Sequence, residues 1–394
     1  MNRFILIATM LLLSLFLVAQ SETGAYNFSV VKENPITSIK NQASSGTCWS
    51  FAGVGVLESE LLRMGKGAHD LSEMYIVRRN YEDQAVKYVR LHGSLNFSAG
   101  GSFADVFETL DEYGVVPEDE YKGLMYGEEN HKHGEIDYLL SGYIKAVIAN
   151  KNRSLSPVWF KGYNGILDAY FGEKPTSFQK NGKTYSPQNY AEFLGLQSGN
   201  YVSLSSFTHH DFYTQFPVEV PDNWRWAKSY NLPLDEFIEA IDNALMNGYT
   251  VAWATDVSEI GFSHSGIAIV PDLGSSENAG SDQAHWLGLT PGERSNEVRN
   301  KIGKEILKEK EITQEGRQIA YDNYETTDDH GMQIYGIAKD KEDNKFYMVK
   351  NSWGEAGPYN GIWYASEAFV RYKTTNIVIN KEGLPKSIAN KLNL

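Results

Sequence analysis

The chain has 394 residues and a formal net charge of −14 at pH 7, and no basic stripe is interleaved with aromatic residues. These properties argue against nucleic acid and anionic membrane surfaces as partners. With 24 Tyr, 18 Phe and 8 Trp but a single cysteine, the chain must be stabilised by a hydrophobic core rather than by disulfides, and its length is sufficient for one.

The first residues have the features of an export signal. Arg3 precedes the almost wholly apolar run 4–19, which is too short for a comfortable transmembrane span. Residues 18–20 offer a plausible cleavage site. We therefore expect residues 1–20 to be a signal peptide and residues 21–394 to be exported to the periplasm or the extracellular space. The alternative is an N-terminal anchor that is not cleaved.

A helix is expected directly after Cys48. Phe51, Val54, Leu57 and Leu61 recur every three or four residues, so Cys48 lies at or near the helix N-terminus. The helix dipole and the free backbone N–H groups favour a thiolate at such a position. The alternative interpretation is a buried cysteine that packs like a small hydrophobic residue.

Periodicity predicts helices first and strands last. The charge-rich piece 304–311 is expected to be a solvated helix face within the mostly helical segment 294–323. This order predicts an α+β chain, in which a cleft separates a helical half from a strand-rich half. Other helices are expected at 71–79, entered through Asp70, and at 103–113, 136–148, 159–170 and 234–246. Strands are expected at 201–204, 250–254, 266–270, 332–338, 345–350, 361–364 and 376–379.

A cysteine nucleophile needs a base and a third group that orients the base. Among nine histidines, His330 stands at the mouth of one expected strand, and Asn351 follows the next strand. Two adjacent antiparallel strands would bring these residues to the same rim of a sheet. Asn351 can then fix the tautomer of the imidazole ring, and Trp353 can shield that hydrogen bond from water. The alternative interpretation of residues 351–354 is a turn with a packed tryptophan.

The other histidines are expected to lie in solvated loops. His131 and His133 form one pair, and His209 and His210 form another, but no acidic or cysteine ligand is evident to complete a metal site. We therefore predict no metal centre. Two further histidines stand in loop contexts without an evident partner, namely His264 and His285.

The order of four motifs resembles that of the papain-like cysteine peptidases. The resemblance implies a two-lobed α+β fold, with a helical lobe and an antiparallel β-sheet lobe, and it implies no cofactor. The motifs are Gln42 with Cys48-Trp49-Ser50-Phe51, Gly100-Gly101, His330-Gly331-Met332, and Asn351-Ser352-Trp353-Gly354.

The resemblance also implies roles for single residues. Cys48 would attack the scissile carbonyl, His330 would pair with the thiolate and protonate the leaving amine, and Asn351 would orient His330. The side chain of Gln42 and the backbone N–H of Cys48 would form the oxyanion hole. The bare backbone of Gly100-Gly101 would pair with an extended peptide substrate, because a Cβ would block that approach.

Within these peptidases, the chain looks like the bleomycin hydrolase and aminopeptidase C branch. Cys48 and His330 are 282 residues apart, roughly twice the usual separation in compact papain-like enzymes. The segments 100–117, 200–204 and 216–220 support this branch, which implies a subfamily insertion at roughly 120–230. It further implies an aminopeptidase that forms a thioester acyl-enzyme with peptide substrates, and a ring-like homohexamer.

One departure from that branch concerns the last residues. In these aminopeptidases a C-terminal arm runs into the cleft, and its terminal carboxylate pairs with the amino group of the substrate. No such arm is recognisable in residues 381–394, and 386–392 has a helix-forming composition. We therefore expect a more open cleft. The alternatives are an exported papain-like endopeptidase, a thiol-dependent acyl or peptidyl transferase, and an inactive peptide-binding homologue.

Overall fold

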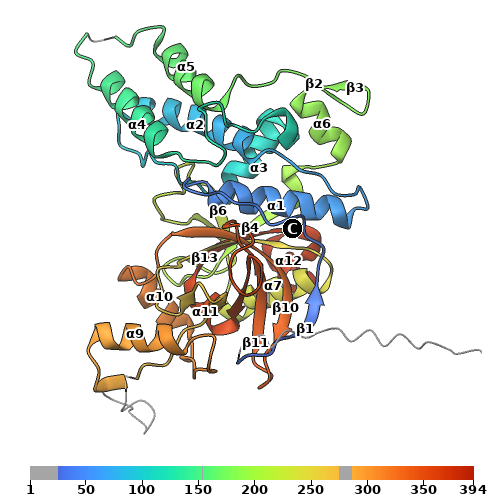
Figure 1. Ribbon diagram of the computed structural model, residues 1–394, viewed down its shortest axis with the longest axis vertical. Coiled ribbons are helices and arrows are strands. Elements are labelled where there is room, and N and C mark those ends of the chain that lie inside the picture. Colours follow the sequence, from blue (N-terminus) through green and yellow to red (C-terminus); the bar gives the residue numbers. More distant parts are fainter. Residues whose placement is uncertain (1–24, 153, 275–285) are drawn as a thin grey trace, which may run out of the picture.

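The computed structural model describes residues 25–152, 154–274 and 286–394. The expected leader and His285 lie outside these residues. In Figure 1 a group of helices lies above α1 (Cys48–Arg63) and a large sheet lies below it, so α1 separates the two lobes. The chain thus has the predicted α+β class with a helical lobe and a sheet lobe. No helix in the described residues is both long and apolar enough to cross a membrane.

The helical lobe packs around α1, because α2 and α3 both lie against it. The second helix begins at the side chain of Ser72, which accepts a hydrogen bond from the N–H of Tyr75 at 3.0 Å, and not at Asp70 as predicted. Asp70 instead pairs with Lys40 at 2.7 Å. The other elements of this lobe are α2 (Glu73–Arg90), α3 (Phe103–Tyr113), η1 (Glu118–Glu120), α4 (Gly134–Ile148), α5 (Trp159–Phe171), β2 (Phe178–Lys180), β3 (Lys183–Tyr185), α6 (Pro187–Leu194) and η2 (Ser198–Asn200).

The sheet lobe is an eleven-stranded mixed sheet in the described residues, with the order β5-β6-β4-β13-β7-β10-β11-β12-β9-β8 and β1 paired to β10. Most pairs are antiparallel, as predicted, but β4 with β6 and β12 with β9 are parallel. The strands are β1 (Ser29–Glu33), β4 (Tyr201–Ser205), β5 (Gln215–Pro217), β6 (Lys228–Asn231), β7 (Val251–Thr255), β8 (Phe262–Ser263), β9 (Ile267–Ala268), β10 (His330–Lys339), β11 (Lys345–Lys350), β12 (Ile362–Ser366) and β13 (Thr374–Asn380). The helices of this lobe are α7 (Leu234–Met246), α9 (Pro291–Lys301), α10 (Gln314–Asp322), α11 (Glu367–Lys373), η3 (Lys381–Gly383) and α12 (Lys386–Leu392).

The charge-rich piece 304–311 is not a helix, so that prediction was wrong. It lies between α9 and α10, and the N–H of Lys310 donates to the carbonyl of Val270 at 2.9 Å. Ile306 and Leu307 pack against a small core cluster that includes Tyr26. Anchoring these neighbouring apolar residues to the sheet lobe outweighs the helix propensity of the charged residues around them.

A buried glutamine joins the two lobes. Gln333 on β10 is fully buried, and its Nε2 lies 3.1 Å from the carbonyl oxygen of Gly55 and 2.7 Å from Oγ of Ser59, both on α1. A third partner is Thr250, whose Oγ1 lies 3.0 Å away. Because a buried amide must keep its hydrogen bonds, these contacts fix α1 on the sheet.

The loop between β5 and β6 is fastened to the helical lobe by Arg225. Its Nε lies 2.6 Å from Oδ1 of Asp105, a fully buried carboxylate on α3, and its Nη2 lies 2.8 Å from Oδ2 of Asp83 on α2. The same Nη2 donates to Oδ1 of Asn80 at 2.7 Å. This loop contributes one wall of the cavity described below, so Arg225 holds that wall in place.

Replacing Arg225 by alanine is expected to destabilise the protein by about 3–5 kcal/mol, because the buried carboxylate of Asp105 loses its cation. The midpoint of urea unfolding measures the loss. The control is Lys180→Ala, which removes a pair with Asp119 between side chains that are 32% and 66% exposed. Such a surface pair contributes at most about 1 kcal/mol. Equal midpoint shifts for the two variants would contradict this role of Arg225.

Candidate active site

Cys48 is the first residue of α1, as the periodicity predicted. It lines a cavity of about 690 Å³ whose walls come from both lobes. Cys48 is partly exposed as a residue, and the backbone N–H of Gly331 on β10 points to its Sγ at 3.4 Å. The cysteine is therefore open to the cavity rather than packed as a core residue.

His330 and Asn351 meet at the rim of the sheet, as predicted. β10 and β11 pair antiparallel, and Nε2 of His330 lies 2.8 Å from Oδ1 of Asn351. The backbone N–H of Ser352 donates to the same oxygen at 2.7 Å. Since this oxygen only accepts, the hydrogen of the neutral imidazole lies on Nε2, which leaves Nδ1 as the unprotonated nitrogen. The ring of Trp353 covers His330 with a centroid distance of 4.9 Å.

The two lobes approach closely at Gly331. A Cβ placed on this glycine would lie 3.2 Å from Cα of Trp49 and 3.3 Å from the ring of Phe103. These distances are shorter than most Cβ contacts, so a larger residue would push β10 away from the first turn of α1. The absence of a side chain at Gly331 thus lets His330 and Cys48 share the cavity.

The side chain of Gln42 also lines the cavity, and two hydrogen bonds hold it. Its Nε2 donates to the carbonyl of Ser45 at 2.7 Å, and its Oε1 accepts from Oγ of Ser352 at 2.6 Å. One hydrogen of the amide remains for a ligand. The orientation of Gln42 is therefore set before any substrate binds.

Gly100 and Gly101 form a strip of bare backbone in the cavity wall. A Cβ on Gly101 would lie 2.8 Å from the ring of Trp49, and a Cβ on Gly100 would lie 2.0 Å from a carboxylate oxygen of Asp222. Asn96 donates to the Oδ1 of Asp222 at 3.0 Å and so holds this carboxylate over Gly100.

The sequence analysis gave no site role to the acidic residues that line the cavity, among them Asp222 and Asp328. Asp222 comes from the β5–β6 loop, and Asp328 lies two residues before His330, the first residue of β10. Burial, together with Asp222 and Asp329, raises the pKa of Asp328 to about 8. Burial also raises the pKa of Asp222. The exposed Lys228 lines the same cavity, yet within the described ranges neither Asp222 nor Asp328 forms an ion pair. The nearness of Asp328 to His330 in the sequence is the one feature that could have placed Asp328 in the cavity.

The protonation of the two reactive groups is set by burial. Burial raises the pKa of Cys48 to about 12, although the N–H of Gly331 opposes this, and the carboxylates of Asp328 and Asp222 raise it further. Burial lowers the pKa of His330 to about 4, against the hydrogen bond to Asn351. Each residue on its own would therefore be neutral at pH 7. A proton transfer from the thiol to the imidazole creates both charges together, and each then offsets the desolvation cost of the other.

The first histidine pair does not lie in a solvated loop as predicted. His133 is fully buried and His131 is 9% exposed. Their rings pack edge-on against Phe171 and Phe51 respectively. Burial lowers the pKa of His131 to about 4 and that of His133 to about 3, so both are neutral core residues. The sequence did not show this burial, because Phe51 and Phe171 lie far from the histidine pair along the chain.

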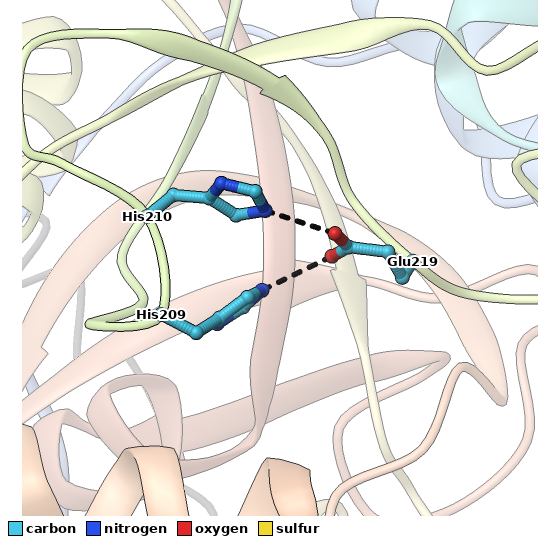
Figure 2. Close-up of side chains that lie close together, drawn as sticks. All are labelled: His209, His210 and Glu219. Atoms are coloured by element: carbon cyan, nitrogen blue, oxygen red, sulfur yellow. Dashed lines mark hydrogen bonds and ion pairs between the residues drawn. The ribbon is translucent and has the colours of Figure 1, made fainter.

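The second pair does lie near the surface, but the expectation that no acidic residue is placed beside it was wrong. Nε2 of His209 and Nε2 of His210 point to the two oxygens of Glu219, at 3.1 and 2.9 Å (Figure 2). Glu219 follows β5, which brings the chain back beside the pair. His264 lies by Trp353, with a ring centroid distance of 6.0 Å.

The segment after β13 packs on the sheet lobe. Residues 386–392 form α12, as their composition predicted, and its Ile388 and Leu392 are buried in the same core cluster as residues of α7. Lys391 pairs with Glu236 at 2.8 Å. No residue of the described segment 381–394 lines the cavity.

Comparisons with known proteins agree with this architecture. Residues 26–166 match the papain family cysteine protease, and residues 305–394 match the Peptidase C1-like family. The chain is 22% identical to aminopeptidase C of Listeria monocytogenes over 90% of this chain and 82% of the relative. It is 21% identical to aminopeptidase C of Streptococcus thermophilus over 88% of this chain and 81% of the relative.

Among solved structures, PepW of Lactobacillus rhamnosis superposes with a TM-score of 0.68, at 17% identity over 93% of this chain and 84% of PepW. With Cys48 of the helical lobe and His330 of the sheet lobe lining one cavity, the chain belongs to the papain family and is a cysteine peptidase. Within that family it falls in the bleomycin hydrolase and aminopeptidase C branch, as its sequence motifs predicted.

Proposed function

We propose that this peptidase is an aminopeptidase that works through Cys48, His330 and Asn351. Proton transfer from Cys48 to Nδ1 of His330 gives the thiolate, which attacks the carbonyl carbon of the scissile bond. The imidazolium returns its proton to the leaving amine, and a thioester to Cys48 remains. Water activated by His330 then hydrolyses the thioester and regenerates the thiol. Asn351 keeps the ring in the tautomer that this sequence requires.

The oxyanion of each tetrahedral intermediate binds to two N–H donors. One is Nε2 of Gln42, which the contacts to Ser45 and Ser352 hold in place. The other is the backbone N–H of Cys48 in the first turn of α1, where N–H groups lack an intrahelical partner. Each such donor typically contributes on the order of 3 kcal/mol to the transition state.

The observation that carries the aminopeptidase proposal is the position of Asp222 over Gly100. The residues on the N-terminal side of the scissile bond pair with the backbone of Gly100-Gly101. A long peptide running along this strip would meet the carboxylate of Asp222, so the strip accepts only a short N-terminal segment. The side chain of Asp222 therefore blocks the end of the strip to further substrate residues.

The same carboxylate supplies recognition of the substrate amino group. Asp222 and Asp328 are acidic, partly buried and without an ion-pair partner in the described parts of the chain. An α-ammonium group at this end of the cavity neutralises their mutual repulsion and keeps them ionised. A free N-terminus is thus bound, while an acetylated N-terminus offers no charge.

The test compares a peptide with a free N-terminus against its N-acetylated twin. Charge-assisted hydrogen bonds contribute about 1.5–3 kcal/mol, so acetylation is expected to reduce kcat/KM by about tenfold or more. Asp222→Asn should reduce kcat/KM for the free peptide by a similar factor and leave the acetylated peptide nearly unaffected. The control is Asp111→Asn, because Asp111 lines the same cavity from α3 and bonds to Ser198.

The second candidate is an endopeptidase, which the packing of 381–394 away from the cavity favours. If the acetylated peptide is cut equally well at internal bonds, this second candidate is correct and the aminopeptidase proposal is wrong. If Asp222→Asn and Asp111→Asn behave alike, Asp222 does not bind the amino group.

A further inference from the structure

The two surface histidines and Glu219 form a convergent set of nitrogen and oxygen ligands. Figure 2 shows the imidazoles of His209 and His210 side by side, with each Nε2 directed to a different oxygen of Glu219. One ligand atom from each residue lies within 4.8 Å of the other two. This cluster lies outside the catalytic cavity and has no part in the proposed reaction.

Aromatic packing holds both imidazole rings. His210 stacks on Phe216 of β5 with a centroid distance of 4.3 Å and an angle of 26°. His209 stacks on Tyr321 of α10 at 5.6 Å and 15°. The directions of the two Nε2 atoms are therefore fixed by side chains that do not themselves bind a ligand, which lowers the ordering cost of binding.

Gln318, which would not bind the ion itself, can form a hydrogen bond with either tautomer of His209. Gln318 on α10 places its Oε1 3.4 Å and its Nε2 3.1 Å from Nδ1 of His209. Gln318 is itself held by the N–H of Thr208 at 2.6 Å and by Asp322 at 2.8 Å. The amide can thus donate to Nδ1 when Nε2 carries the hydrogen, or accept from Nδ1–H when Nε2 is free for a ligand. Contacts of this kind orient metal-bound histidines.

We propose that His209, His210 and Glu219 bind one divalent transition-metal ion of the zinc type. Two histidine nitrogens and one carboxylate oxygen are a common zinc donor set, with water as the fourth ligand. Two ligand atoms on a tetrahedral zinc are about 3.3 Å apart for bond lengths of about 2.0–2.1 Å. Nε2 of His209 lies 3.1 Å from one oxygen of Glu219 and Nε2 of His210 lies 2.9 Å from the other, and one ligand atom of each residue lies within 4.8 Å of the other two, so a shift of the side chains brings one oxygen and both nitrogens around the ion. For Zn²⁺ to bind, each neutral imidazole carries its single N–H hydrogen on Nδ1, which leaves the lone pair of Nε2 for the ion.

The charge of Glu219 suits this role. Its carboxylate places one oxygen against Nε2 of each histidine, and its negative charge neutralises part of the charge of the ion.

The proposed metal site and the wall of the cavity share one segment of the chain, residues 218–220. Val218 and Val220 line that cavity, whereas Glu219 between them is exposed on the other side of the chain. An ion bound to Glu219 would tie this wall of the cavity to the loop that carries the histidines. Metal binding should therefore stabilise the fold, since an ion that binds only the folded state raises its stability.

The experiment titrates Zn²⁺ into the chelator-treated Cys48→Ala protein by calorimetry. The alanine removes the thiol, which would otherwise compete for zinc. We expect one Zn²⁺ per chain and a higher melting temperature with the ion. His210→Ala and Glu219→Gln, each in this background, should weaken binding at least tenfold. The matched control is His69→Ala, which removes a histidine that contacts Tyr190 in the helical lobe.

The absorption spectrum of bound Co²⁺ provides a second readout, because it reports the coordination geometry of the ion rather than its dissociation constant. Co²⁺ in the Cys48→Ala protein should give the visible absorption of a tetrahedral site, and Glu219→Gln, which keeps the shape of the side chain, should remove it. Circular dichroism without metal verifies that each variant is folded. The proposal is overturned if the Cys48→Ala protein binds no stoichiometric Zn²⁺, or if binding survives the loss of both His210 and Glu219.

Discussion

Cys48→Ala is expected to lower kcat for peptide hydrolysis by at least about a thousandfold, since loss of a nucleophile usually costs more than that. Cys48 is the only cysteine of the chain, so no second thiol can replace it. Its thiol opens into the cavity that His330 and Gln42 also line. Alanine keeps the helix start intact because it is a good helix former. The measurement is single-turnover cleavage of a peptide with a free N-terminus.

Two controls accompany this variant. The melting temperature of Cys48→Ala should match that of the wild type, which separates lost chemistry from lost folding. An electrophilic peptide that alkylates thiols should label the wild type and leave Cys48→Ala unlabelled. A folded variant that retains more than about a thousandth of kcat would show that another residue supplies the nucleophile.

His330→Ala is expected to be nearly as damaging as Cys48→Ala, whereas Asn351→Ala should retain partial activity. In the proposed mechanism, His330 both accepts the thiol proton and protonates the leaving amine. Asn351 transfers no proton, because it only fixes the ring through the 2.8 Å hydrogen bond to Nε2. The ratio of kcat values for the two variants measures this difference, and we expect Asn351→Ala to be faster by about tenfold or more.

The pH profile adds a readout that a merely structural effect would not change. In Asn351→Ala, the hydrogen bond that opposes the lowering of the His330 pKa is gone. The pKa of His330 should therefore fall further, and the acidic limb of the kcat/KM profile should move to lower pH. Asn351→Asp serves as the matched variant, since it keeps an oxygen acceptor and adds a charge that raises the pKa of His330. Equal losses in His330→Ala and Asn351→Ala, with the fold unchanged, would assign Asn351 more than an orienting role.

The helix start at Cys48 and the contact between His330 and Asn351 could be predicted because their signals are local. Cys48 starts an amphipathic helix, and His330 and Asn351 stand at neighbouring ends of two adjacent strands. The helices at 103–113 and 234–246 agree to the residue with α3 and α7, because strong apolar periodicity and flanking turn residues define both.

The features that could not be predicted depend on contacts between distant parts of the chain. Glu219 reaches the histidine pair only because β5 returns beside it, and Asp222 reaches Gly100 only through the packing of the β5–β6 loop on the helical lobe. Burial of His133 arises in the same way, against Phe171. The hydrophobic pattern within a short window of sequence does not show which distant residues will pack against it. Packing against the core likewise keeps 304–311 from forming a helix.

The division of the reactive pair between α1 and β10 has a consequence for biosynthesis. Cys48 leaves the ribosome 282 residues before His330, which corresponds to roughly 15–60 s of translation. During that time the chain holds the proposed nucleophile without the proposed base. β10 is also a central strand, paired with β7, β11 and β1, so its pairing in the sheet is complete only after β11 has been made. If the proposed mechanism is correct, peptide hydrolysis can begin only after both residues have been synthesised and the two lobes have packed together.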